Sequence, residues 1–411
     1  MSSFKFIEAG GITSVPGFRA AGVTAGFKRS GAPDFALVVS DEAETEFAGV
    51  FTSCLFAAAP VRLDRERVRD SRRLRAVAIN SGIANACTGE QGMRAARESC
   101  RIASELLGFS PEEIAVASTG RIGDQLDMDL IRKGLELAIP ALSGEERAGA
   151  DAARAIMTTD TVPKSIAATL EVGGGKVTIG AMSKGAGMIN PTLKALHATM
   201  ICVITTDAKI AKPLLMEMLA FDAENSFNRI TVDGDMSTND TVLVLANGRS
   251  GVEILPGTPE AESFRDALGE VMRNLARRMV ADGEGATKLV TVEVVNARSA
   301  ADAKLAAEAV ANSLLCKTAW FGNDPNWGRV VAALGYSGAQ FDPDRTDVFF
   351  GALPVVKAGG PAGTPEAELV KAVSGPEFTI RCDLRAGDAE YWVWTSDVSY
   401  EYVKINADYH T

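Results

Sequence analysis

The sequence lacks the residues on which several common kinds of catalytic site depend. It has only two histidines, His197 and His410. With so few histidines, a histidine metal site or a serine-histidine-aspartate triad is nearly excluded. The six cysteines are scattered and form no C-x-x-C pair, which argues against a zinc knuckle or a redox motif. We therefore expect free thiols.

The chain also lacks long apolar and long basic segments. Residues 1–8 contain no signal-peptide hydrophobic core, and no apolar run approaches the ~20 residues of a membrane span. A net charge of −11 makes nucleic acid and anionic membranes poor partners. One arginine-rich stretch, 62–75, is interleaved with acidic residues, and we interpret it as an ion-paired surface segment. These features together predict a cytoplasmic protein.

What the chain does have is an ordinary folded composition, with 46% hydrophobic and 23% charged residues. Its 411 residues are too many for one simple core, so we expect two or more subdomains. In Ala261–Ala281 the apolar residues recur at helical spacing, which predicts a helix with one buried face. Strand-like runs such as Ala76–Asn80, Met200–Thr205 and Thr241–Ala246 alternate with helical patterns, so the class is α/β or α+β with layered sheets.

The most informative segment surrounds Thr199. The small residue Ala198 precedes it, and an apolar, β-rich run follows at once. If the Ala198–Thr199 bond breaks, Thr199 carries both a hydroxyl nucleophile and an α-amine that can activate it. Such an amine has a reference pKa of roughly 7.7–8.0, so it can act as a base at physiological pH. The plainer alternative is that Thr199 is only the edge of a core strand.

Two polar turns supply further candidates. Ser118-Thr119-Gly120 follows an apolar run, and a strand that ends there leaves backbone N–H groups that can hold an oxyanion. Glu284 lies between two glycines, which let a backbone approach a ligand closely, and its carboxylate suits an ammonium group. The alternatives are a strand-to-helix turn and a tight turn. No Walker pattern occurs, which argues against binding of a nucleoside triphosphate.

Taken together, the longer motifs resemble the ornithine acetyltransferase (glutamate N-acetyltransferase) family of arginine biosynthesis. The resemblance covers essentially the whole chain, and the motifs occur in family order. The resembling segments are Asn80–Gly89, Ser118–Gly120, Ile156–Thr161, Lys184–Ile189, Ala198–Met200, 225–240, Asp282–Lys288, Lys317–Ala319, Asp324–Arg329 and the last eight residues.

The resemblance implies a self-cleaving enzyme whose two chains stay together. Cleavage before Thr199 would give an α chain, 1–198, and a β chain, 199–411, and members of the family are usually heterotetramers of two α and two β chains. The implied fold is similar to that of self-cleaving aminopeptidases, with a layered β-α-α-β core. We expect the core part of the β chain to reach about residue 298 and a smaller C-terminal α/β domain to comprise 299–411.

The resemblance also assigns the residues of the site. It makes Thr199 the nucleophile and Thr119 and Gly120 the oxyanion-hole pair. The implied substrate-contacting set is Thr158, Lys184, Thr199, Glu284, Asn406 and Thr411. Lys184 suits the substrate α-carboxylate, and Glu284 suits the side-chain ammonium of ornithine. The acetyl group would pass from N-acetylornithine to Thr199 and then to glutamate without a metal or organic cofactor. A bifunctional member would also accept acetyl-CoA.

The chain departs from the family pattern immediately before the cleavage site. Thr199 lies fifteen positions after Lys184, four more than in the family pattern, and Lys194–His197 is the simplest place for the insertion. The insertion either extends a helix by about one turn of ~3.6 residues or changes the strained geometry that cleavage requires. Two other hypotheses therefore stay open. One is a self-cleaving amidase or aminopeptidase that uses water as acceptor, and the other is an uncleaved, non-catalytic descendant.

Overall fold

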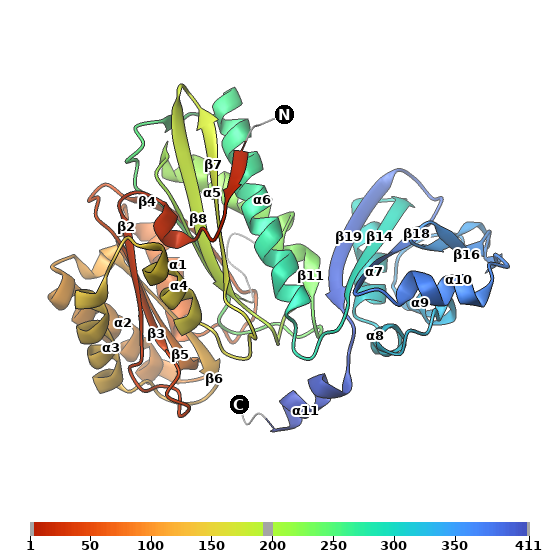
Figure 1. The fold of residues 1–411 in the computed structure, drawn as a ribbon, viewed down its shortest axis with the longest axis horizontal. Coiled ribbons are helices and arrows are strands. Elements are labelled where there is room, and N and C mark those ends of the chain that lie inside the picture. Colours follow the sequence, from red (N-terminus) through yellow and green to blue (C-terminus); the bar gives the residue numbers. More distant parts are fainter. Residues whose placement is uncertain (1–3, 192–199, 409–411) are drawn as a thin grey trace. The chain divides into compact units, whose positions relative to one another are not determined.

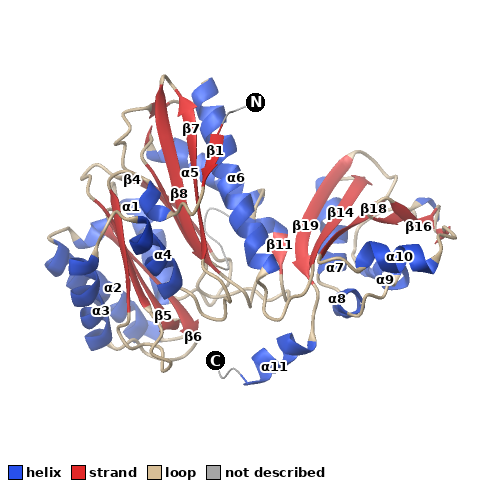
Figure 2. Cartoon of the chain, in the orientation of Figure 1, coloured by secondary structure: helices blue, strands red, loops and turns tan. Residues whose placement is uncertain are grey.

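The computed structural model describes residues 4–191 and 200–408, which divide into two compact units (Figure 1). The larger unit extends to Asn228 and includes Met236–Met279, and the smaller unit comprises Arg229–Asp235 and the chain from Val280 onward. Helices and strands mix in both units (Figure 2), which confirms the layered α/β class. The smaller unit begins before the boundary expected near residue 298, because the strand Leu289–Ala297 (β14) lies inside its sheet.

Among its described residues, the larger unit has two main sheets. One has six strands in the order β1-β7-β8-β9-β12-β4, and the other has four in the order β2-β3-β5-β6. The bounds in the first sheet are Phe4–Ile7 (β1), Lys164–Val172 (β7), Gly175–Lys184 (β8), Ile201–Thr206 (β9), Thr241–Ala246 (β12) and Glu46–Phe51 (β4). Those in the second are Phe18–Val23 (β2), Phe35–Ser40 (β3), Ala76–Ile83 (β5) and Ile114–Arg121 (β6). The short strands Lys209–Ile210 (β10) and Glu253–Ile254 (β13) form a separate pair.

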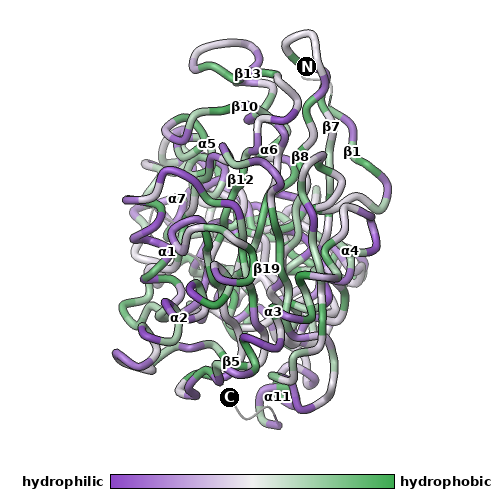
Figure 3. The backbone as a smooth tube through the Cα atoms, turned by 90° about the vertical axis from the view of Figure 1, so that its left-hand side faces the viewer, coloured by the Kyte–Doolittle hydropathy of each residue, from purple (hydrophilic) through white to green (hydrophobic). Residues whose placement is uncertain are grey.

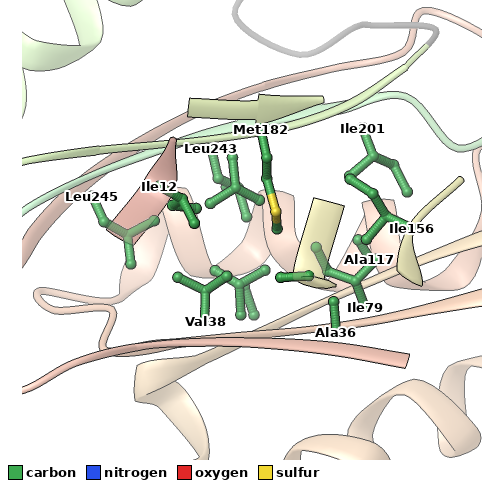
Figure 4. Close-up of a cluster of buried hydrophobic side chains, with 14 of the residues drawn as sticks. Ile12, Ala36, Val38, Ile79, Ala117, Ile156, Met182, Ile201, Leu243 and Leu245 are labelled. Atoms are coloured by element: carbon green, nitrogen blue, oxygen red, sulfur yellow. The ribbon is translucent and has the colours of Figure 1, made fainter. Parts of the chain in front are cut away.

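The facing sides of these two sheets share one hydrophobic core. Val38 and Ile79 of the four-stranded sheet lie in the same cluster as Met182 and Leu243 of the six-stranded sheet (Figure 4). Every residue of β12 is buried, and its apolar run is green in Figure 3. A continuous apolar run of this kind is typical of a strand that is covered on both faces. The core between the sheets therefore fixes where the strand ends lie.

Helices surround this core. The bounds are Ala59–Asp70 (α1), Gly89–Leu107 (α2), Met128–Ala141 (α3), Glu146–Ala155 (α4), Lys212–Glu224 (α5) and Pro259–Ala281 (α6). Helices α2 and α3 pack on the other face of the four-stranded sheet, and α1 and α4 add residues to the core between the sheets. Arg278 of α6 donates a hydrogen bond to the carbonyl of Ser165 in β7 over 2.7 Å. In the part of the chain that the structure describes, no helix is long and apolar enough to cross a membrane.

The arginine-rich stretch does not lie wholly on the surface. Arg69 and Arg73 make exposed ion pairs with carboxylates, as expected. Arg67, however, is buried in α1 and donates to the carbonyl oxygens of Pro111 and Ile114. The guanidinium can be buried because backbone carbonyls accept its hydrogens.

The smaller unit is built on a seven-stranded sheet in the order β11-β19-β14-β18-β15-β16-β17. The remaining strand bounds are Ile230–Thr231 (β11), Asp347–Phe350 (β15), Leu353–Lys357 (β16), Gly360–Pro361 (β17), Glu377–Asp383 (β18) and Ala389–Ser396 (β19). The helices are Ala300–Ala311 (α7), Leu314–Phe321 (α8), Trp327–Tyr336 (α9), Glu366–Val373 (α10) and Tyr400–Asp408 (α11). Its separate core includes Val292, Trp320 and Ile380.

Candidate active site

Three strands of the six-stranded sheet reach the same edge at the candidate site. Lys184 is the last residue of β8, and the antiparallel register pairs it with Ile201, the first residue of β9. Thr241, the first residue of β12, pairs with Ile201 from the other side. The backbone N–H of Thr241 also donates to the carbonyl of Met200. Met200 is therefore held at the edge where Lys184 lies.

Three of the predicted site residues, Ala198, Thr199 and Thr411, lie outside the described residues, as does the insertion Lys194–His197. Cleavage and the nucleophile therefore stay predictions. Met200 follows Thr199 directly in the chain and is described and buried.

The end of β6 in the other sheet contacts Lys184. The Lys184 ammonium donates a hydrogen bond to Thr119 Oγ1 over 3.0 Å, and both residues are buried. Strand β6 runs through Thr119 and Gly120 to Arg121, because these residues pair with the end of β5. The structure thus brings three of the predicted residues together from two sheets.

Gly120 can only be glycine in this conformation. Its φ is +124°, and a Cβ there would lie 2.3 Å from the carbonyl carbon of Gly82. The peptide before Thr119 is also fixed, because the side-chain amide of Asn239 donates to the carbonyls of Ser118 (2.7 Å) and Ala84 (2.6 Å). A backbone held this rigidly suits an oxyanion hole, which needs donors that are oriented before the reaction.

Asp160 connects one further predicted residue, Thr158, to the end of β8. Its side chain is fully buried, and Oδ1 accepts hydrogen bonds from Lys164 Nζ and from the N–H of Gly185, each over 2.7 Å. Oδ2 accepts from the N–H of Thr158 over 3.1 Å. Burial raises the pKa of Asp160, but the charges of Lys184 and Lys164 and these hydrogen bonds outweigh it, so the pKa falls below its ordinary value. Asp160 is therefore ionised, and it fixes the backbone N–H groups of Thr158 and of Gly185, the residue after Lys184.

Sequence reasoning gave no role to Asp160, Lys164, Asn239 or Asp240, although three of them lie in motifs that carry the family resemblance. Asp240 follows Asn239 at the start of β12 and is buried. Burial raises its pKa well above the ordinary value, although the hydroxyls of Ser237 and Thr52 and the charge of Lys184 act in the other direction. Burial therefore favours the protonated form of the Asp240 carboxyl. The polar residues Asn239 and Asp240, placed directly before an apolar strand, were the available signal.

The smaller unit places Glu284 in a tight turn that contacts α11. Gly285 has a φ of +64°, and a Cβ there would lie 2.5 Å from the backbone nitrogen of Tyr402. The hydroxyl of Ser399 donates to the carbonyl of Gly285 over 2.6 Å. The side-chain amide of Asn406 donates to Glu284 Oε2 over 2.7 Å. Two more of the predicted residues thus lie together, and the chain near its C-terminus is docked as expected.

The surroundings of this turn are acidic. Burial raises the pKa of Tyr402, and the negative charges of Asp233, Glu284 and Asp235 raise it further. Glu284 itself is buried, with 7% of its surface exposed. A buried group of like charges favours a cationic partner.

Comparisons with known proteins agree with these motifs. The model of the ArgJ family matches residues 19–411. The chain is 52% identical over 406 residues to the arginine biosynthesis bifunctional protein ArgJ of Symbiobacterium thermophilum, covering 98% of this chain and 99% of that protein. It is 45% identical over 410 residues to the glutamate N-acetyltransferase of Methanocaldococcus jannaschii, covering 98% and 99%.

Among solved structures, the ornithine acetyltransferase from Mycobacterium tuberculosis complexed with ornithine is 42% identical, covers 46% of this chain and 100% of that chain, and has a TM-score of 0.43. The matches along the full sequence decide the assignment, because they span nearly every residue of the chain and of its relatives. The chain belongs to the ArgJ family.

Proposed function

We propose that this protein transfers the acetyl group of N-acetylornithine to glutamate and thereby releases ornithine and N-acetylglutamate in arginine biosynthesis. The observation that carries the proposal is the match over nearly the whole chain to relatives named for this chemistry. The contact between Lys184 and Thr119 supports it, because it joins a substrate-binding cation to the proposed oxyanion hole.

In the first half of the reaction, the hydroxyl of Thr199 attacks the acetyl carbonyl of N-acetylornithine. The α-amine of Thr199 accepts the hydroxyl proton and passes it to the leaving nitrogen as the amide C–N bond breaks. Ornithine leaves, and the acetyl group remains as an ester of Thr199. Thr119 and Gly120 stabilise the oxyanion of the tetrahedral intermediate.

In the second half, the amino group of glutamate attacks this ester, and the C–O bond to Thr199 breaks. The proton lost by the attacking amine returns to the threonine oxygen, which restores the hydroxyl. The reaction is ping-pong and needs no metal or organic cofactor. Acetyl-CoA would serve as a second acetyl donor if the protein is bifunctional, as the name of the Symbiobacterium relative says of that protein.

The remaining site residues bind the substrates. Lys184, together with Thr158, binds the α-carboxylate that both amino acids share. Glu284 binds the side-chain ammonium of ornithine, and Asn406 orients Glu284 through the hydrogen bond between them. Thr411 completes the substrate-contacting set.

We further propose that the chain cleaves itself between Ala198 and Thr199 into an α chain, 1–198, and a β chain, 199–411. The two chains stay associated, in a heterotetramer of two α and two β chains. The regular pairing of β9 with both β8 and β12 supports this, because the new N-terminus would stay joined to a buried strand.

Denaturing mass spectrometry of the purified protein tests the cleavage, and an assay with N-acetylornithine and glutamate tests the transfer. We expect two fragments and acetyl transfer from the wild type, and one intact chain without transfer from Thr199→Ala. Thr192→Ala, a threonine upstream in the same segment, is the matched control and should be cut and active. An intact wild-type chain without activity would favour the non-catalytic descendant. Release of acetate in place of N-acetylglutamate would favour the amidase.

A further inference from the structure

The loop between β2 and β3 carries a lysine that the proposed mechanism does not use. The buried carboxylate of Asp34 accepts hydrogen bonds from the N–H groups of Ala25 (2.6 Å), Gly26 (3.0 Å) and Lys28 (2.9 Å). These three bonds fix the backbone of the loop. The side chain of Lys28 is half-buried, and its ammonium donates to the carbonyl of Pro33 over 2.7 Å.

This loop packs against the strand ends of the candidate site. A Cβ on Gly82 would lie 2.9 Å from the carbonyl oxygen of Phe27, the residue before the loop lysine. Gly82 in turn lies against Gly120. Neither the φ of Gly120 nor the space beside Gly82 permits a side chain on Gly120. Gly120 follows Thr119, whose hydroxyl accepts the hydrogen bond from Lys184. Backbone contacts therefore connect the loop, through Gly82 of β5, to the end of β6 that contains Thr119 and Gly120.

The charges agree with this placement. The pKa of Lys28 lies below its ordinary value, mainly because the side chain is partly buried. The negative charges of Asp34 and Asp160 raise this pKa, and the positive charge of Lys184 lowers it. Lys28 thus lies within electrostatic reach of the same two charges that form the site. Within residues 4–191 and 200–408, Lys28 makes no ion pair, whereas Lys164 is fully buried against Asp160. Of these three lysines, Lys28 is the most accessible.

The proposed reaction needs a cation that the roles assigned so far do not supply. N-Acetylornithine and glutamate share an α-carboxylate, which Lys184 binds, but their distal groups have opposite charges. Glu284 suits the ammonium of ornithine and would repel the side-chain carboxylate of glutamate. Glutamate therefore requires a second positive group.

We propose that Lys28 binds the side-chain carboxylate of glutamate and so determines which amino acid accepts the acetyl group. This inference rests on the proposed function and adds a specificity-determining residue to it. An ammonium group has three donor hydrogens, so Lys28 can keep its bond to Pro33 and still donate to a carboxylate. Its partial burial strengthens that interaction, because the local dielectric constant is lower than in water.

Acceptor competition between glutamate and glutamine tests the proposal, with N-acetylornithine as the donor. Lys28→Gln removes the charge but keeps an N–H donor for the carbonyl of Pro33. Lys28→Arg keeps the charge. The matched control is Lys133→Gln, an exposed lysine of α3 beside the same loop, whose Nζ lies 3.8 Å from a Cβ built on Gly26.

In Lys28→Gln, the preference for glutamate over glutamine in kcat/KM should fall about tenfold to a hundredfold, mainly through KM for glutamate. The single-turnover release of ornithine should stay as in the wild type. Lys28→Arg should keep most of the preference, and Lys133→Gln should keep all of it.

An unchanged preference in Lys28→Gln overturns the proposal, and so do equal losses in ornithine release and in transfer, which would indicate a general role. If Lys28→Gln does not fold, Lys28→Arg is compared with the wild type for glutamate against aspartate. The longer, forked cation should change that ratio, and an unchanged ratio overturns the proposal. A wild-type protein that transfers no acetyl group to glutamate would instead refute the proposed function itself.

Discussion

The two units differ in the sign of the charge that they place among their candidate site residues. In the larger unit, Lys184 and Lys164 surround one ionised carboxylate, Asp160. In the smaller unit, Glu284 lies among other acidic residues around Tyr402. The larger unit therefore suits a carboxylate of an amino-acid substrate, and the smaller unit suits an ammonium group. Under the proposed function, the first group is the α-carboxylate that ornithine and glutamate share, and the second is the side-chain ammonium that only ornithine has.

The units also hold these charges by different means. In the larger unit, the charged groups bond to one another inside the core, so their loss should affect folding as well as binding. In the smaller unit, a glycine turn and one amide, from Asn406, hold Glu284. The predicted effects of single substitutions should therefore be larger in the first unit than in the second.

The largest effect is expected for Asp160→Asn. The change leaves the fully buried charge of Lys164 without its carboxylate, which typically costs about 3–5 kcal/mol of the free energy of unfolding. Urea denaturation measures the loss, and the double variant Asp160→Asn/Lys164→Met should recover part of it. Asp151→Asn is the control, because its ion pair with Arg154 is half-exposed and worth about 0.2–1 kcal/mol. If Asp160→Asn lowered the free energy of unfolding by less than Asp151→Asn does, Asp160 would not be the buried partner that stabilises Lys164.

The two cores should respond to pH in opposite directions. Burial raises the pKa of Asp64 in the larger unit to about 7, although Arg67 and the N–H of Val116 lower it. The folded state thus holds this proton more tightly than the unfolded state, whose ordinary pKa is 3.8. The stability that protonated Asp64 contributes is present below about pH 4 and is lost between about pH 4 and 7. Over this range the free energy of unfolding should fall by at most about 1.4 kcal/mol per pH unit.

Lys317 in the smaller unit should give the free energy of unfolding the opposite dependence on pH. Burial lowers its pKa from 10.5 to about 7, although Asp233 and Asp397 raise it. The folded state releases this proton more easily, so its stability contribution is present at alkaline pH and is lost as the pH falls from about 10 to 7. Melting temperatures across pH should become flatter between 4 and 7 in Asp64→Asn, and flatter between 7 and 10 in Lys317→Met. Parallel curves for the wild type and both variants would show that neither group titrates as described.

A smaller effect, on catalysis, is expected for Lys184→Met. Both substrates have an α-carboxylate, and a hydrogen bond to a charged group is worth about 1.5–3 kcal/mol, so kcat/KM should fall roughly tenfold to a hundredfold for both. Lys176→Met changes an exposed lysine at the other end of β8 and should leave the kinetics unchanged. A loss confined to one substrate would reject the α-carboxylate role.

The smallest effect is expected for Glu284→Gln, because the amide can still accept the hydrogen bond from Asn406. KM for N-acetylornithine should rise about tenfold in an exchange assay, and KM for N-acetylglutamate should not, because only ornithine has a distal ammonium. Glu401→Gln, an exposed carboxylate of α11, is the control. Equal increases for both substrates would remove Glu284 from the ammonium role and would end the contrast between the two units.

Elements with a strong local pattern could be predicted from the amino-acid sequence alone. The run predicted as a strand at Thr241–Ala246 is β12 with the same bounds, and the helix predicted over Ala261–Ala281 is α6, Pro259–Ala281. Hydrophobic periodicity is a local property, so a window of the sequence contains it completely. Motif order likewise gave the family assignment, because many motifs together are specific even without a structure, and the site roles of Lys184, Thr119 and the other residues of the family set stay predictions.

Which side chains come into contact depends on the packing of the whole fold. Asp160 contacts Lys164 and Gly185, and Lys184 contacts Thr119, through strand register and packing that join distant parts of the chain. The same holds for Arg67, whose burial depends on carbonyls beyond its own helix. Contacts of this kind come from the pairing and burial of whole sheets. No local window of sequence contains them, because the partner residues that determine burial and pKa lie elsewhere in the chain.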